Sequence, residues 1–177
     1  ELAVGKRESG GVYICKDKYL MDKFTAYSKK QLTANAEALA KLQKQLEGEG
    51  ISMNTILVPV AAQVLADKLP AYAPAADYAT ILQVLTDAGV DTVDAFSALD
   101  AHSGESIYYR TDHHWTSLGA FYGANAILEA MGRKPLDLSD YVPTTVSESF
   151  YGTIFSTSGV RWLPPDSIET YIPEDGV

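Results

Sequence analysis

In the middle of the chain, short apolar runs alternate with a helical segment, and this alternation limits the folds that are possible. The run over residues 51–60 is almost continuously apolar and ends near Pro59, which is typical of a parallel strand buried on both faces. A helical pattern over 77–89 and a second short strand over 92–96 follow it. Strand, helix and strand at this spacing predict a right-handed βαβ unit, and therefore an α/β fold with a parallel sheet.

Two further segments have the apolar spacing of amphipathic helices. Between Ser28 and Glu47, leucine and alanine side chains recur every three or four residues, with Lys and Gln between them. Residues 118–131 repeat the pattern and end at Gly132. Both segments are therefore predicted to be amphipathic helices.

The remaining segments carry strand and turn patterns. Residues 11–24 predict a hairpin or two short strands, and residues 106–110 predict a strand directly before the second amphipathic helix. From Leu136 onward, prolines and scattered aromatic residues predict loops with short strands. No repeat, low-complexity tract or linker divides the sequence, so residues 1–177 are expected to form a single α/β domain.

Composition excludes several kinds of partner and site. The chain has 14 Lys and Arg against 23 Asp and Glu, and this net charge of -9 argues against binding to nucleic-acid phosphates. The most apolar stretch, residues 56–66, is too short to span a membrane. A single Cys15 permits no internal disulfide and no Cys-rich zinc site, and we expect it to be a small buried apolar residue. No cofactor is expected, and the sequence leaves the oligomeric state open.

The residues with the most evident chemistry lie together between residues 108 and 116. This segment reads Tyr-Tyr-Arg-Thr-Asp-His-His-Trp-Thr and lies at a predicted junction between strand and helix, where α/β folds place active sites. Asp112 and His114 are two residues apart, so their side chains would leave an extended backbone on the same side. The carboxylate would then fix the tautomer of the imidazole, as the orienting residue and the base of a hydrolytic triad do. The alternative is that the pair only orders the loop and caps the helix.

Two other histidines allow further interpretations. We expect His113 to point away from Asp112 and to be a packed or solvated histidine. A metal site formed by His102, Asp112 and either His113 or His114 is a less favoured hypothesis, because the spacing matches no strong metal motif.

The stretch TDHHWTSLGA, residues 111–120, resembles the signature of the bacterial DHHW-motif protein family. That family is similar to the SGNH hydrolases and to the periplasmic alginate O-acetyltransferases, whose Thr-Asp-x-His-Trp-Thr segment matches residues 111–116. Less specific similarity extends over residues 12–24, 57–70 and 150–171.

The resemblance implies a three-layer, SGNH-hydrolase-like (flavodoxin-like) α/β fold with a mainly parallel central sheet. It implies that Asp112 orients His114, and that His114 is the general base for a serine nucleophile. The implied activity is that of a carbohydrate O-acetyltransferase or acetyl esterase, acting on a cell-surface or extracellular glycan without a metal. An extracytoplasmic location, in the cell envelope or outside the cell, follows from the same resemblance.

The serine that this chemistry needs has no clear counterpart in the chain. In the similar alginate enzymes it follows the Asp-x-His segment on an Asp-Ser element at a tight turn, whereas here Asp166 and Ser167 precede a β-like run. Ser156 and Ser158 lie in a glycine-flanked loop and are expected to form turns. The explanation we favour is that this sequence, which begins with Glu1 and not Met, is a fragment of a longer domain that contains the serine.

A function of a different class is the alternative. Without a catalytic serine the chain would be an inactive carbohydrate-binding or scaffold module of the cell envelope, and its 11 Tyr and 2 Trp would provide stacking surfaces. A glycan is the expected partner under both hypotheses, and an acyl ester only under the first.

Overall fold

The structure is a computed structural model that describes residues 7–24, 27–74 and 77–173. Its strands are β1 (Glu8–Ser9), β2 (Val12–Ile14), β3 (Leu20–Asp22), β4 (Thr55–Leu57), β5 (Thr92–Asp94), β6 (Tyr141–Phe150) and β7 (Asp166–Pro173). Its α-helices are α1 (Lys29–Gly48), α2 (Ala61–Val64), α3 (Ala79–Asp87), α4 (Phe96–Asp100), α5 (Ser117–Ala130) and α6 (Thr153–Ser158). Within these described ranges, no helix combines the length and the hydropathy needed to cross a membrane.

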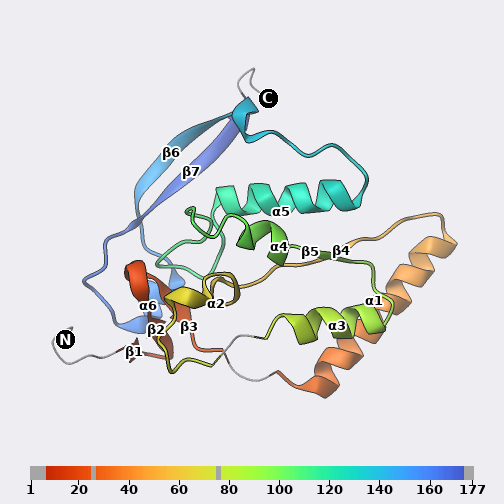
Figure 1. The fold of residues 1–177 in the computed structure, drawn as a ribbon, viewed down its shortest axis with the longest axis horizontal. Helices are drawn as coiled ribbons and strands as arrows, with labels where there is room; N and C mark the ends of the chain where they lie inside the picture. Colours follow the sequence, from red (N-terminus) through yellow and green to blue (C-terminus); the bar gives the residue numbers. More distant parts are fainter. Residues whose placement is uncertain (1–6, 25–26, 75–76, 174–177) are drawn as a thin grey trace.

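The centre of the fold is a pair of parallel strands with helices on both sides. β4 pairs with β5 so that Thr55 lies opposite Thr92 and Leu57 lies opposite Asp94. Figure 1 shows α5 on one side of this pair and α3 on the other, and both helices contact β5. The chain runs from β4 through α2 and α3 to β5, so the predicted βαβ unit and the α/β fold class are confirmed.

β4 is shorter and more exposed than the sequence predicts. The apolar run over residues 51–60 predicts a strand buried on both faces, but only Thr55–Leu57 form the strand, and all three are half-buried. Among the described strands β4 pairs with β5 alone, so no second strand lies along its other edge.

α1 confirms the first predicted amphipathic helix, although its buried face differs from the predicted one. Ala36, Ala40 and Gln43 are buried, whereas Leu42 is 45% exposed. The buried amide is satisfied because Oε1 of Gln43 accepts a hydrogen bond from the backbone N–H of Asp91 at 2.8 Å. A polar residue therefore fixes α1 against the turn that leads from α3 into β5.

α5 confirms the second predicted helix and packs closely against Trp115. Thr116 caps the helix, since its Oγ1 accepts a hydrogen bond from the backbone N–H of Gly119 at 3.2 Å. A Cβ atom at Gly123 would lie 2.6 Å from the indole ring of Trp115. The absence of a side chain at Gly123 is thus what lets the indole approach the helix this closely.

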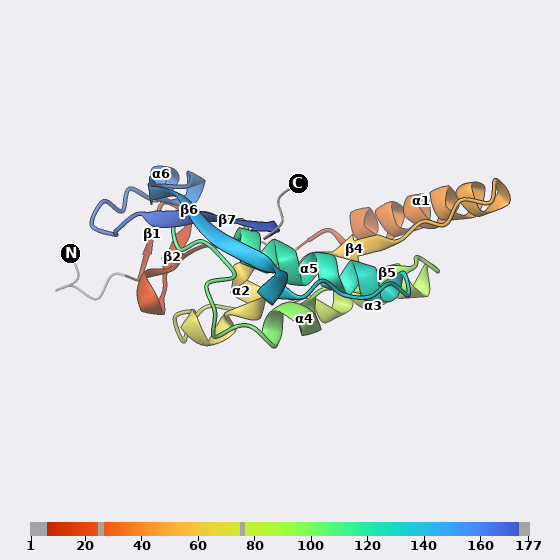
Figure 2. The same ribbon diagram turned by 90° about the horizontal axis from the view of Figure 1, so that it is seen from above.

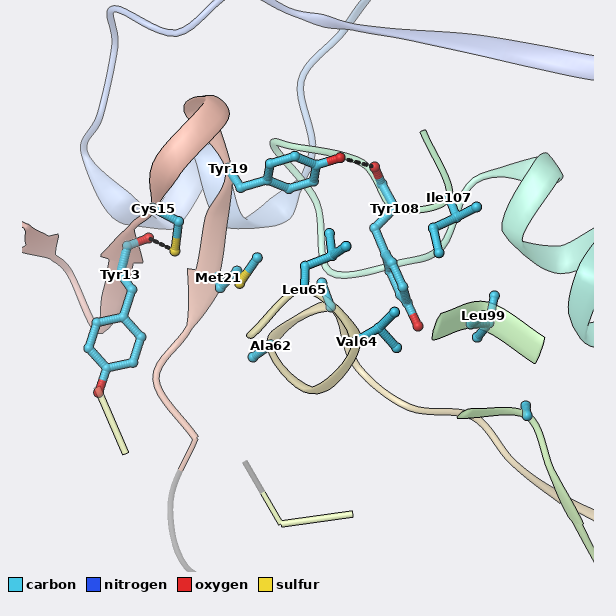
Figure 3. Packing of buried hydrophobic residues seen from close by; sticks show 12 residues of the cluster. Tyr13, Cys15, Tyr19, Met21, Ala62, Val64, Leu65, Leu99, Ile107 and Tyr108 are labelled. Carbon is cyan, nitrogen blue, oxygen red and sulfur yellow. Dashed lines mark hydrogen bonds between the residues drawn. The ribbon is translucent and has the colours of Figure 1, made fainter. Parts of the chain in front are cut away.

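The largest hydrophobic core joins the N-terminal strands to the segment before α5. Figure 3 shows Tyr19 and Leu65 beside Ile107 and Tyr108, and all four are buried. The hydroxyl of Tyr19 donates a hydrogen bond to the main-chain carbonyl of Tyr108 at 3.4 Å. Cys15 is buried in the same core, as predicted, and burial raises the pKa of its thiol to about 12.

The C-terminal part contains longer strands than the sequence predicts. β6 and β7 have 10 and 8 residues and form an antiparallel ribbon, with α6 in the connection between them. Most of β6 is exposed, so its sequence lacks the apolar alternation that marks a half-buried strand. Pro143 is tolerated because β6 is an edge strand among the described residues. Figure 2 shows α6 and the N-terminal strands at one end of the molecule and α1 at the other.

Replacement of Gly123 by alanine tests the packing of Trp115. Alanine in a helix is normally more stable than glycine by about 1 kcal/mol, but overpacking costs about 1–3 kcal/mol. We expect Gly123→Ala to lower the free energy of unfolding in urea by about 1 kcal/mol. Gly48→Ala is the control, because a methyl group there would meet no atom within 4 Å, and it should leave stability equal or higher. Equal effects of the two substitutions would contradict the packing argument.

Candidate active site

A tight loop carries the Asp-His segment to the start of α5. The backbone N–H of Thr116 donates a hydrogen bond to the carbonyl of Ile107 at 2.9 Å, and a single antiparallel bridge pairs Tyr108 with Trp115. The prediction of a strand over residues 106–110 is therefore wrong, because Tyr108 forms only an isolated bridge within its own loop. One further backbone hydrogen bond, from the N–H of Leu20 to the carbonyl of Arg110 at 2.8 Å, links the segment to β3.

Asp112 and His114 contact each other inside this loop. Nδ1 of His114 lies 2.5 Å from Oδ1 of Asp112, and the same oxygen accepts a hydrogen bond from the backbone N–H of His114 at 3.0 Å. The side chains meet because the chain turns here, and not through the extended backbone that the sequence predicted. The side chain of Asp112 is 4% exposed and that of His114 is 66% exposed. One partner is thus fixed inside the protein while the other reaches solvent.

The second carboxylate oxygen of Asp112 is held by the first turn of α6. Oδ2 accepts hydrogen bonds from the backbone N–H of Thr153 at 2.8 Å and from its hydroxyl at 3.0 Å. Burial by itself raises the pKa of Asp112, but these bonds and the two from His114 outweigh it, and the pKa falls from 3.8 to about 2. The carboxyl is therefore ionised at neutral pH.

This charge determines which nitrogen of His114 carries the proton. An ionised carboxylate can only accept hydrogen bonds, so Nδ1, 2.5 Å from Asp112, must be the donor. In the neutral ring Nε2 is then unprotonated. No hydrogen bond joins Nε2 to another residue in the part of the chain that the structure describes, so this nitrogen is available to take a proton.

Thr111 and Gly152 bring three distant segments together at this point. A Cβ atom at Gly152 would overlap the side chain of Asp112, so only glycine permits the close approach of α6. The backbone N–H of Gly152 donates to Oγ1 of Thr111 at 3.2 Å, and that of Phe155 donates to the carbonyl of Thr111 at 3.0 Å. Thr111 also donates its N–H and hydroxyl to Oδ2 of Asp166, at 2.8 and 2.6 Å.

His113 lies closer to Asp112 than the sequence predicts. Its Nδ1 is 3.0 Å from Oγ1 of Thr153 and 4.0 Å from Oδ1 of Asp112, and its ring centroid is 4.0 Å from that of His114. The prediction that His113 points away from Asp112 is wrong, because the chain bends at this residue instead of continuing as a strand.

The structure also changes the metal hypothesis. One potential ligand atom from each of Asp112, His113 and His114 lies within 4.8 Å of the other two. His102 does not belong to this group, because its ring stacks on Tyr122 with the centroids 3.5 Å apart. The predicted set that includes His102 is therefore wrong. Any ion bound by the other three residues would have to replace hydrogen bonds that already satisfy Asp112.

No candidate serine is hydrogen-bonded to His114 within the described residues. Ser156 and Ser158 donate their hydroxyls to main-chain carbonyls of the α6 segment, at 3.1 and 3.0 Å. Ser167 lies in the extended strand β7 and not at a tight turn. Ser156 and Ser158 thus lie in the helix α6 and not in a turn, and none of the three serines is hydrogen-bonded to His114.

Two cavities are lined in part by the loop. The larger, of about 440 Å³, is lined by four tyrosines, Arg110, and side chains with hydroxyl or carboxylate groups that include Ser167 and Glu169. The smaller, of about 120 Å³, is mostly apolar and is bordered by Asp112 and His113. The loop therefore presents polar groups to the larger cavity and the buried carboxylate to the smaller one.

Sequence reasoning missed the residues that hold Asp112. Gly152 and Thr153 form a glycine-threonine pair before a short helical run, which is a capping pattern, but such a pattern does not indicate which carboxylate it will meet. In the sequence, Asp166 stands out only as half of an Asp-Ser pair. Nothing in the local sequence indicates that its carboxylate is bound by Thr111, 55 residues earlier.

Comparison with known proteins finds a matching family and a curated relative. Residues 16–168 match the family described as SGNH hydrolase-like domain, acetyltransferase AlgX. The probable alginate O-acetylase AlgJ of Pseudomonas aeruginosa is 30% identical over 118 residues, which cover 62% of this chain and 30% of AlgJ.

Solved structures give the same fold. A DHHW family protein from Eubacterium siraeum superposes with a TM-score of 0.77 at 29% identity, over 94% of this chain and 56% of that protein. The O-acetyltransferase domain of Pseudomonas putida AlgJ gives a TM-score of 0.72 at 23% identity, over 93% of this chain and 66% of that domain. The predicted resemblance to DHHW proteins and alginate O-acetyltransferases is confirmed, and the chain spans only part of the length of these proteins.

Acid unfolding tests the environment of Asp112. Its pKa lies below the ordinary 3.8 in the folded protein, so its stabilisation is complete above pH 4 and is lost as the pH falls toward 2. A shift of this size corresponds to about 2 kcal/mol. We expect the difference in unfolding free energy between the wild type and Asp112→Asn to shrink by that amount between pH 5 and pH 2, as measured in urea. A difference that stays constant over this range would contradict the assigned environment.

Proposed function

The chain belongs to the family of SGNH hydrolase-like domains of acetyltransferase AlgX, and on this premise we propose that it catalyses acyl transfer to or from a glycan. The proposed activity is that of a carbohydrate O-acetyltransferase or acetyl esterase that acts on a cell-surface or extracellular glycan. Asp112 is the proposed orienting residue and His114 the proposed general base. A serine nucleophile completes the mechanism, and no residue of this chain is assigned to it.

The contact between Asp112 and His114 is the observation that carries the proposal. The buried carboxylate holds Nδ1 of His114 at 2.5 Å, and four hydrogen bonds to Asp112 keep it ionised and oriented. Nε2 then faces outward as the basic nitrogen of a largely exposed ring. A pair used only to order the loop would not need to leave the basic nitrogen of His114 accessible.

The proposed reaction has two halves. First, Nε2 of His114 takes the proton from the serine hydroxyl while the serine oxygen attacks the carbonyl carbon of the acyl donor. The bond from that carbon to the leaving oxygen breaks, the leaving alcohol receives the proton from His114, and an acyl-serine remains. Second, a sugar hydroxyl gives its proton to His114 and attacks the acyl-serine, which releases the acylated sugar and returns the proton to the serine. Water in place of the sugar makes the protein an esterase.

The names of the relatives support the choice of substrate. One curated relative is named as a probable alginate O-acetylase, and the matching family is named for an acetyltransferase. We therefore propose an acetyl group as the acyl group and a glycan outside the cytoplasm as the acceptor. Under this proposal the protein works in the cell envelope or is secreted.

A binding module without catalytic activity is the second candidate. It is favoured by the position of the described serines, none of which is hydrogen-bonded to His114. The cavity of about 440 Å³, with its tyrosines and polar side chains, would then hold a sugar by stacking and hydrogen bonding.

Ester hydrolysis and serine labelling test the proposal. The full-length protein encoded by the gene is assayed with p-nitrophenyl acetate, and a serine-reactive sulfonyl fluoride is mapped by mass spectrometry. We expect His114→Gln to lower the rate by about 10²- to 10⁴-fold, as loss of a general base does, and to abolish labelling of one serine. His102→Gln is the control, since His102 stacks on Tyr122 outside the dyad, and its rate should equal that of the wild type.

Two results would reject the enzymatic proposal. Equal rates for the wild type and His114→Gln would remove His114 as the base. No turnover of nitrophenyl or natural acyl esters, together with no labelled serine, would favour the binding module. Titration with glycan fragments would then measure that second function directly.

A further inference from the structure

Thr111, directly before Asp112, is a completely buried polar residue. It is 0% exposed, and its backbone N–H, its carbonyl and its hydroxyl are all hydrogen-bonded to residues more than 40 positions away in the sequence. A buried threonine in a core normally needs one partner for its hydroxyl. The number and the distance of these partners indicate that Thr111 has a connecting role.

On one side, Thr111 is bound by a second buried carboxylate. Oδ2 of Asp166 accepts from the N–H and the hydroxyl of Thr111 at 2.8 and 2.6 Å, and Oδ1 accepts from Nε of Arg110 at 3.0 Å. Asp166 is 4% exposed, so these three donors compensate its burial. One carboxylate therefore fixes the two residues that precede Asp112.

On the other side, Thr111 holds the first turn of α6. Its hydroxyl oxygen accepts from the N–H of Gly152 at 3.2 Å, and its carbonyl accepts from the N–H of Phe155 at 3.0 Å. The next N–H in that turn belongs to Thr153, which donates to Oδ2 of Asp112 at 2.8 Å. The position of α6 relative to Thr111 therefore sets the position of the donors that orient Asp112.

The chemistry of the partners requires a hydroxyl at position 111. The carboxylate of Asp166 accepts and the N–H of Gly152 donates, so the group between them must donate and accept at the same time. Serine and threonine can do this, whereas the isosteric valine cannot do either. The hydroxyl of Thr111 therefore donates to Asp166 and accepts from Gly152.

We propose that Thr111 and Asp166 are positioning residues for the dyad of Asp112 and His114, and that they act by holding α6 in the place where it orients Asp112. The proposal deepens the proposed function and rests on it for its catalytic consequence. Neither Thr111 nor Asp166 is proposed to contact the substrate. Their effect on the reaction is transmitted through the donors of Thr153 and the carboxylate of Asp112.

The test compares Thr111→Val with Thr111→Ser in the full-length protein. Two readouts are used: the NMR signal of the hydrogen-bonded Nδ1 proton of His114, assigned by its absence in His114→Gln, and the values of kcat and KM for p-nitrophenyl acetate. We expect Thr111→Val to shift or broaden the NMR signal and to lower kcat about 10- to 100-fold with KM little changed, because displaced catalytic groups lose orientation. Thr111→Ser should restore the NMR signal and most of kcat.

Asp166→Asn is the second variant and keeps the test decisive if Thr111→Val does not fold. Its amide oxygen can still accept from Thr111, but its NH₂ group would face the donor Nε of Arg110, so an intermediate shift of the His114 signal is expected. Circular dichroism at each temperature used confirms that the compared variants are folded.

The outcomes separate this inference from the proposed function. Wild-type NMR signals and wild-type kcat in a folded Thr111→Val, or in Asp166→Asn where the valine variant is unfolded, would overturn the positioning role. A protein without turnover whose His114 signal still responds to Thr111→Val would retain the structural coupling while the proposed enzymatic function fails.

Discussion

The hydrogen bonds around the carboxylate of Asp112 are the interaction on which the rest of the site depends. An ionised carboxylate that is 4% exposed would be strongly destabilising without partners, and here four donors surround its two oxygens. Two of the donors come from His114 and two from the first turn of α6, so the loop and the helix must both be in place. The same four bonds keep the pKa low, although burial alone would raise it.

The site divides its tasks between a fixed residue and an exposed one. Asp112 lies inside the protein, where its orientation is set by α6, while the side chain of His114 is 66% exposed. A base must reach the group whose proton it takes, and its ring must still be held in one tautomer. Support from the buried side and access from the open side satisfy both conditions.

Packing beneath the loop makes this arrangement possible. Tyr19 holds the main chain at Tyr108 (Figure 3). Trp115 lies against α5 at Gly123 and packs on the same hydrophobic core, so both ends of the loop are attached to it. The connection from β6 through α6 to the start of β7 then returns to the same loop and brings Gly152 and Asp166 against it. Several of these contacts depend on glycine or threonine at one position, where a larger or apolar side chain would break a specific bond.

Local sequence patterns are enough to identify α1, α3, α5, the βαβ unit and the pair of Asp112 and His114, because each pattern consists of residues that are close in the chain. Apolar periodicity gave α1 and α5, and the short motif resembled a family that the comparisons confirm. The bend at His113, the length of the exposed β6 strand, and the roles of Gly152 and Thr153 beside Asp112 depend instead on tertiary contacts. The physical reason is that a carboxylate can be satisfied by donors from any segment that packs against it. Neither local propensity nor periodicity contains the information about which distant segment that will be.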